Sequence, residues 1–222
     1  MIELFMDYLS FDVGIKNLAY CCLTEDKNIK QWGIINMNTN PICDVKLRKK
    51  CEKQATYEVR NDNNVKFCCS AHSKRFKKKK KLNNNKDILK LSQICISKLK
   101  ELDISNVKCV LIENQPALKN PIMKSIQMII YTYFVIEGIM NDKSSIEDIY
   151  MVNARNKLKV YKGPKIECNK KDKYAINKFL SIAYTEIMIE KDEDNFKKIF
   201  NESKKKDDLA DAYLQGIYWI EK

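Results

Sequence analysis

The stretch LSFDVGIKNLAY, residues 9–20, constrains the fold most, because it places an acid inside a run that otherwise suits a buried β-strand. Its apolar residues alternate with Ser10 and Asp12, so Asp12 faces the side of the strand opposite to them. A carboxylate in such a place is costly unless something compensates it. The sequence therefore predicts a compensating group elsewhere in the chain.

Segments with strand and helix patterns surround one polar insertion. Strand patterns cover residues 4–14, 18–25, 29–37, 107–114 and 146–153, and helical spacing covers residues 87–102, 120–140, 170–188 and 207–221. The first three strands indicate an antiparallel meander. The helix–strand–helix–strand–helix order that follows is typical of a mixed α/β fold with one central sheet.

Composition narrows the class of partner and the compartment. The chain has 222 residues and a formal net charge of +12, which favours a polyanionic partner such as nucleic acid. It begins MIELFMDYLSFDVG, which lacks the pattern of a secretory signal, and we expect no apolar run of the roughly 18 residues that a membrane span needs. We therefore expect an intracellular, reducing location without membrane association, where the nine cysteines bind metal more often than they form disulfides.

Other acids follow apolar runs in the way that Asp12 does. Glu113 ends the fourth strand pattern, and the last helix carries Asp207, Asp208 and Asp211, of which the last two are i, i+3 neighbours. Taken singly, Asp207 suits a helix N-cap and Glu113 a solvated strand end. Converging at one sheet edge, the acids would repel each other unless divalent cations such as Mg²⁺ or Mn²⁺ neutralised them. Two such ions about 4 Å apart suit phosphodiester hydrolysis.

Three segments together resemble a known family. SFDVGIKNLAY, LIENQP…NPIMKSIQMIIYTYF and KKKDDLADAYLQGIYW are similar to the poxvirus-type Holliday junction resolvases, the RuvC-like branch of the ribonuclease H superfamily. The motifs D-x-G-x-K-N, I-E-x-Q-P and D-D-x-x-D-A occur in order. The resemblance implies an α/β, ribonuclease H-like fold, a mixed five-stranded sheet flanked by helices, built from residues 1–40 and 86–222. Residues 41–85 would be a small inserted zinc-binding module.

The resemblance also implies a set of site residues. The metal ligands would be Asp12, Glu113, Asp208 and Asp211, holding two Mg²⁺ or Mn²⁺ ions. Asp207 fits less well, because the family's two C-terminal acids are three positions apart. The family carries an active-site lysine, for which we expect Lys173, with Lys170 and Lys171 nearby; a solvated lysine at a helix start is the alternative.

The partners implied are four-way and branched DNA and a second copy of the chain in a homodimer. Lys16 and Gln115 are candidate DNA contacts, although a turn lysine is usually just exposed. The broad apolar stripe of residues 120–140 is explained mostly by core packing, and part of it could form the dimer interface. The expected location is the host cytoplasm at viral replication sites, with the nucleus as the alternative.

The insertion has its own candidate metal site. Cys43, Cys51, Cys69 and His72 supply three thiolates and one imidazole, a donor set that suits tetrahedral Zn²⁺. The seven-residue gap between the first two cysteines is wider than usual, and unliganded thiols are the alternative. A polar stretch of this size needs a bound metal ion or a similar cross-link to fold. Cys68 could take the place of Cys69.

A basic run follows the cysteines at residues 74–81. Its candidate DNA-backbone contacts are Lys74, Arg75, Lys77, Lys78 and Lys79. A solvated linker and a nuclear localisation signal are the alternatives.

The leading functional prediction is a metal-dependent endonuclease that resolves Holliday junctions and branched DNA during processing of viral genome concatemers. A ribonuclease H-type enzyme acting on RNA–DNA hybrids would keep the fold and change the substrate. A zinc-containing DNA-binding protein with degenerate acids would have no catalysis at all.

Overall fold

The computed structural model describes residues 6–38, 40–61, 64–82 and 87–222. The chain divides into two compact units, which we call the core unit (up to Met37, and Ser92–Lys222) and the inserted unit (Asn38–Leu91). Two sequence features lie outside the described residues: positions 4 and 5 of the first expected strand, and the Asn-rich linker at 83–85.

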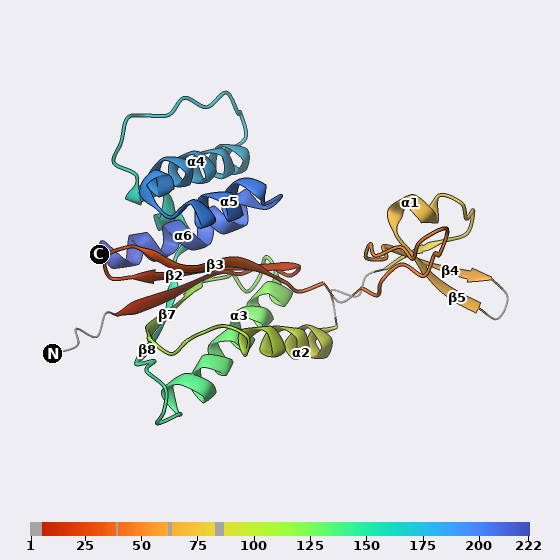
Figure 1. Ribbon diagram of the computed structural model, residues 1–222, viewed down its shortest axis with the longest axis horizontal. Coiled ribbons are helices and arrows are strands. Elements are labelled where there is room, and N and C mark those ends of the chain that lie inside the picture. The colour runs from red at the N-terminus through yellow and green to blue at the C-terminus, as the bar shows by residue number, and fades with distance from the viewer. Residues whose placement is uncertain (1–5, 39, 62–63, 83–86) are drawn as a thin grey trace. The chain divides into compact units, whose positions relative to one another are not determined.

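The core unit is built on one five-stranded sheet (Figure 1). Its strands are β1 (Asp7–Asp12), β2 (Asn17–Thr24), β3 (Ile29–Asn36), β7 (Val107–Glu113) and β8 (Asp148–Val152). They lie in the order β3-β2-β1-β7-β8, with the first three antiparallel and β1, β7 and β8 parallel. The predicted mixed five-stranded sheet flanked by helices is confirmed.

Helices cover both faces of this sheet (Figure 1). They are α2 (Ile88–Leu99), α3 (Pro121–Phe134), η2 (Val135–Ile139), η3 (Ala154–Val160), α4 (Lys173–Met188), η4 (Ile189–Lys191), α5 (Asp194–Glu202) and α6 (Lys206–Ile220). Phe11 of β1 packs on Phe134 of α3, with ring centroids 5.6 Å apart. On the other face, Gln215 of α6 donates a hydrogen bond of 3.1 Å to the hydroxyl of Ser10. Asp12 has the parity of Ser10, so it faces the α6 side, as the alternation predicts.

Close packing sets the position of α6 on the sheet. A Cβ atom at Gly216 would lie 2.6 Å from Cδ1 of the buried Leu23, so a glycine lets the helix approach β2. Trp32 of β3 donates a 3.1 Å hydrogen bond to the Leu209 carbonyl and stacks on Phe200 of α5. This packing matters for function because α6 carries the C-terminal acids.

The helical segment formed by α3 and η2, Pro121–Ile139, corrects one expectation. By length and composition it is apolar enough to cross a membrane, although no run of that kind was expected. The same test is passed by core helices. Ile126, Ile130 and Phe134 of α3 are fully buried against the rest of the core unit, while only 33% of the most apolar stretch of this segment is buried.

The inserted unit has a sheet of its own, in the order β5-β4-β6, and one short helix. Its elements are β4 (Tyr57–Asn61), β5 (Asn64–Cys68), α1 (Ser70–Ser73) and β6 (Lys80–Lys81). The buried apolar residues described between positions 38 and 82 are Cys43, Ala55, Val59, Cys68 and Cys69. Three of these five are cysteines, so ordinary aliphatic packing contributes little to this unit.

Candidate active site and metal-binding cluster

Two carboxylates meet because two neighbouring strands run in parallel. Asp12 is the last residue of β1 and Glu113 the last of β7, and the register pairs Phe11 with Ile112. The carboxyl ends of both strands therefore reach the same edge of the sheet. Asp211 comes to this edge from α6, which packs over β1 and β2.

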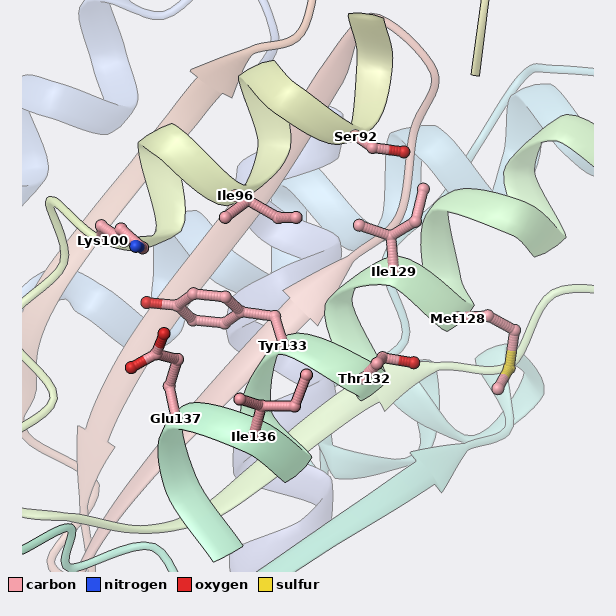
Figure 2. Close-up of a pocket in the computed structure, with 9 residues that line it drawn as sticks. All are labelled: Ser92, Ile96, Lys100, Met128, Ile129, Thr132, Tyr133, Ile136 and Glu137. Carbon is pink, nitrogen blue, oxygen red and sulfur yellow. The ribbon is translucent and has the colours of Figure 1, made fainter. Parts of the chain in front are cut away.

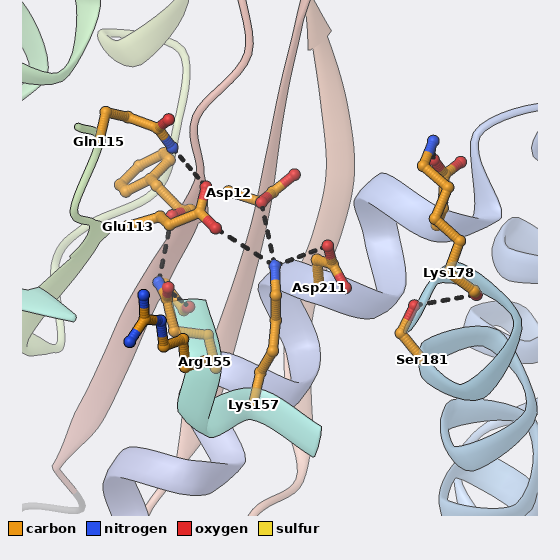
Figure 3. Close-up of polar contacts among 12 residues, drawn as sticks. Asp12, Glu113, Gln115, Arg155, Lys157, Lys178, Ser181 and Asp211 are labelled. Carbon is orange, nitrogen blue, oxygen red and sulfur yellow. Dashed lines mark hydrogen bonds and ion pairs between the residues drawn. The ribbon is translucent and has the colours of Figure 1, made fainter. Parts of the chain in front are cut away.

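Lys157 joins these three acids at one centre (Figure 3). Its Nζ lies 2.6 Å from an oxygen of Asp211, 3.3 Å from Glu113 and 3.5 Å from Asp12. The lysine belongs to η3, which directly follows β8, the parallel neighbour of β7. The compensating group for the strand acid is thus, in this structure, an ammonium.

Electrostatics at this centre are strongly shifted by burial. Burial raises the pKa of Asp12 well above its ordinary value; Lys157 opposes that rise, while Glu113 and Asp211 add to it. The pKa of Asp211 is raised for the same leading reason. Although burial acts to lower the pKa of Lys157, its attraction to the three carboxylates outweighs this and raises the pKa. One ammonium faces three carboxyl groups, so the negative charge of this centre is not fully compensated when all three are ionised.

The other two C-terminal acids have separate partners. Asp208 accepts a 3.4 Å hydrogen bond from the side-chain amide of Asn17 and lies 3.6 Å from the Lys205 ammonium. Its pKa is raised by burial and by the neighbouring Asp207. Asp207 forms an ion pair with Lys178 of α4; although burial acts to raise its pKa, this pairing lowers it. Asp207 is therefore held in an ion pair of its own, apart from the centre at Lys157.

A polar network orients Glu113 from behind. Gln115 donates its side-chain amide to the Glu113 carboxylate, which Figure 3 shows as a dashed line. The backbone N–H of Gln115 in turn donates a 2.8 Å hydrogen bond to the fully buried side chain of Gln127 on α3. We expected Gln115 to contact DNA. In this structure its side chain positions an acid.

The lysine in contact with the acids is Lys157 and was not anticipated. Lys173 is exposed at the first position of α4, next to its N-cap Asp172. Lys16 is exposed in the turn between β1 and β2. The sequence held a partial signal for Lys157: it lies four residues beyond the strand expected at 146–153, which the structure places parallel to β7.

The donor set fits a hard divalent cation. Asp12, Glu113 and Asp211 offer only carboxylate oxygens, and they already converge on a positive group. Asp208 precedes Asp211 by one helical turn. The structure joins Asp12, Glu113 and Asp211 through Lys157, and the predicted set of ion ligands adds Asp208, whose own contacts are with Asn17 and Lys205.

The inserted unit contains a second donor cluster. The ligand atoms of Cys43, Cys51, Cys69 and His72 all lie within 4.8 Å of one another. Nδ1 of His72 is 3.4 Å from the Cys43 sulfur and 3.5 Å from the Cys69 sulfur. Sulfur and nitrogen ligands of a tetrahedral zinc ion are about 3.6 Å apart. This cluster contains Cys69, while Cys68 is buried with its thiol pKa raised by that burial.

Comparison with known proteins identifies a viral relative. No family model matches the sequence. The sequence is 34% identical to the uncharacterized protein L451 of Acanthamoeba polyphaga mimivirus, an alignment that covers 97% of this chain and 75% of that protein. The chain belongs to the L451 family.

Solved structures identify the fold of this L451 family member. The yeast mitochondrial Holliday junction resolvase Ydc2 matches with a TM-score of 0.53 and 15% identity, over 96% of this chain and 78% of that one. The fowlpox virus resolvase in complex with its substrate Holliday junction DNA matches with a TM-score of 0.45 and 20% identity, over 97% of each chain. The Ydc2 match shows that this chain shares the fold of that protein, as the motifs predict.

Proposed function

We propose that this protein is a divalent-metal-dependent endonuclease that resolves four-way and branched DNA. The observation that carries the proposal is the convergence of Asp12, Glu113 and Asp211 at the edge of a sheet with the fold of Ydc2. Burying three acids together disfavours folding unless positive charge compensates them. In a phosphodiester nuclease such a group of acids holds the catalytic cations.

The proposed cofactors are two Mg²⁺ or Mn²⁺ ions held by Asp12, Glu113, Asp208 and Asp211. When bound, such ions supply Lewis-acid stabilisation of the charge that develops on the phosphodiester group. Gln115 keeps the Glu113 carboxylate oriented, and Gln127 holds the backbone of Gln115. The chain's own residues thus preorganise the oxygen ligands before substrate arrives.

Lys157 is the proposed catalytic lysine in place of Lys173. Its ammonium and a cation compete for the same carboxylate oxygens, because all three acids contact its Nζ. A cation held by these carboxylates would leave the Lys157 ammonium available to donate hydrogen bonds to the scissile phosphate. A cationic donor at that point stabilises the negative charge of the transition state.

The homodimer is proposed to form through the face made by α2 and α3. A cavity of about 470 Å³ opens there between the two helices, and Figure 2 shows its lining. Ile96, Met128 and Ile136 are more than a third exposed on this face. A second copy would cover them and would place two active sites symmetrically on a four-way junction.

The biological role that we propose is processing of viral genome concatemers, at replication sites in the host cytoplasm. The supporting observation is the relationship to a protein of a giant virus. We further propose that the ion in the Cys/His cluster is zinc, from its sulfur and nitrogen donors.

The test is cleavage of two labelled substrates by the full chain in Mg²⁺. A mobile four-way junction should be nicked symmetrically, leaving ends that a ligase can seal, while an RNA–DNA hybrid of matched length should be left intact. Preferential cutting of the hybrid would instead assign a ribonuclease H activity. Binding of the junction with neither substrate cut, in Mg²⁺ or Mn²⁺, would indicate a non-catalytic DNA-binding protein.

A further inference from the structure

The positive charge of the chain is concentrated in one unit. Residues 38–91 contain 16 basic and five acidic side chains, a net charge of +11 out of the chain's +12. The rest of the chain, three times as long, holds 25 basic and 24 acidic residues and is close to neutral. The unit that carries the acidic site is therefore a weak attractor of polyanions, and the inserted unit is a strong one.

The basic residues are attached to the metal-binding cluster. Arg48, Lys49 and Lys50 immediately precede Cys51 and are all exposed, in a tight loop where Lys46 and Lys50 form a β-bridge. Lys74 and Arg75 follow His72 by two and three residues and are exposed as well. Since Cys51 and His72 belong to one cluster, that cluster ties two basic segments into one unit.

The run that follows is held to the unit's own sheet. The Lys79 ammonium donates a 3.2 Å hydrogen bond to the Ser73 carbonyl and lies 5.3 Å from the centre of the Tyr57 ring. Lys80 and Lys81 form β6, which pairs with β4. Lys77 and Lys78, which immediately precede these anchors, are exposed, so the run is part of a folded surface.

The inserted unit depends on its cluster for stability. Apart from cysteines, the buried apolar residues described between positions 38 and 82 are Ala55 and Val59. Two small side chains stabilise a fold by only a few kcal/mol, which cannot offset the entropy of ordering some 50 residues. A bound metal supplies folding free energy of the size required.

We propose that the inserted unit is a zinc-folded module that binds DNA phosphates and supplies most of the chain's affinity for DNA, separately from any cleavage chemistry. The cluster of Cys43, Cys51, Cys69 and His72 holds the basic segments in place. The phosphate backbone is the partner because the positive groups are dispersed, exposed lysines and arginines, which contact charge and not base sequence.

The first experiment changes charge without touching the cluster. In the full chain, Lys74, Arg75, Lys77 and Lys78 are replaced by Gln, and binding to a 30-base-pair duplex is measured by fluorescence anisotropy over a salt series. Losing four phosphate contacts should lower the slope of log K against log salt by about 3–4 and weaken binding about 10²–10³-fold near 0.1 M salt.

A matched control separates local charge from total charge. Four exposed lysines of the core unit are replaced by Gln in the same way: Lys30, Lys143, Lys191 and Lys198. This control should stay within about threefold of wild type, since it removes the same charge from positions outside the proposed phosphate-binding unit. Equal losses in the two variants would overturn the proposal. The proposal would also be overturned if wild type bound anionic lipid vesicles as tightly as it binds the duplex.

The second experiment tests the metal. Metal analysis of the purified full chain should give one zinc per chain, and Cys51→Ser should lose it together with the duplex affinity. Cys168→Ser, a cysteine outside the cluster, should keep both. Circular dichroism checks that the core unit of Cys51→Ser remains folded. Zinc-free protein that binds DNA as tightly as wild type would contradict the proposal whether or not the protein cleaves junctions.

Discussion

Replacing Lys157 with methionine tests the centre of the candidate active site. The change removes the one ammonium in contact with Asp12, Glu113 and Asp211 and leaves three acids to repel each other. Removing one partner of a buried ion pair costs about 3–5 kcal/mol. Asp211 is a quarter exposed, the largest exposure of the four side chains, so we expect a value near the lower end, about 3 kcal/mol.

Divalent ions should reverse this loss. At a free concentration of Mg²⁺ or Ca²⁺ about 100 times its dissociation constant, binding stabilises the folded state by about 2.7 kcal/mol. At one ion concentration used for both proteins, the gain in stability should be larger in Lys157→Met than in wild type, because the ammonium no longer competes for the carboxylate oxygens and the ion binds more tightly. The chain itself offers a control in Lys159, an exposed lysine two positions further along η3.

The assay is urea unfolding followed by tryptophan fluorescence, in buffer freed of Mg²⁺ and Ca²⁺ by ion-exchange resin and then with either ion added. Lys159→Met should unfold like wild type under both conditions. Should Lys157→Met match that control in metal-free buffer, or gain no more from added ions than wild type does, the three acids would not form a cation site around Lys157.

Three further changes have defined outcomes. Because burial raises the pKa of Asp12, the folded protein binds a proton there more readily than the unfolded chain does, and stability is lost as pH rises. Asp12→Asn should therefore be more stable than wild type at pH 8 without Mg²⁺. In urea melts this difference should vanish toward pH 4. Gln127→Leu leaves the Gln115 N–H without its partner and should cost about 1–3 kcal/mol by the same assay, with no loss counting against the network. Gly216→Ala forces a Cβ against Leu23 and should also cost about 1–3 kcal/mol, and an unchanged midpoint would show that α6 shifts freely.

Much of the fold was predictable because local signals agreed with it. The alternation around Asp12 predicts which side chains face α6, and the structure has Ser10 on that side and Phe11 on the other. Asn120 and Pro121 predict the start of α3; the Asn120 side chain accepts a hydrogen bond from the Met123 N–H.

The site was less predictable where it depends on tertiary position. The acids can be picked out from the sequence, because carboxylates directly after apolar strands are unusual. Lys157 does not, since it lies in a short 3-10 helix with no apolar periodicity, and only the parallel order of β1, β7 and β8 brings it to the acids. Lys173 was the expected choice because the family resemblance implies an active-site lysine, and Lys173 was its best match in the sequence. Pro121–Ile139 shows the converse: its composition alone does not distinguish a core helix from a membrane span, and only 33% of its most apolar stretch is buried.

The cluster in the inserted unit lies between these cases. Three thiols and one imidazole predict a metal site from chemistry alone, but only the structure distinguishes Cys69 from Cys68. The two are adjacent in sequence, but Cys68 is the last residue of β5 and Cys69 is the N-cap of α1.

The most direct test of the central claim is cleavage of a labelled four-way junction in Mg²⁺ by wild type, Asp211→Asn and Asp142→Asn, an exposed acid remote in sequence from the site. We predict paired nicks for wild type and Asp142→Asn. For Asp211→Asn we predict no nicks, with junction binding retained in Ca²⁺. Cleavage by Asp211→Asn at the wild-type rate would contradict the assignment of these acids to the active site.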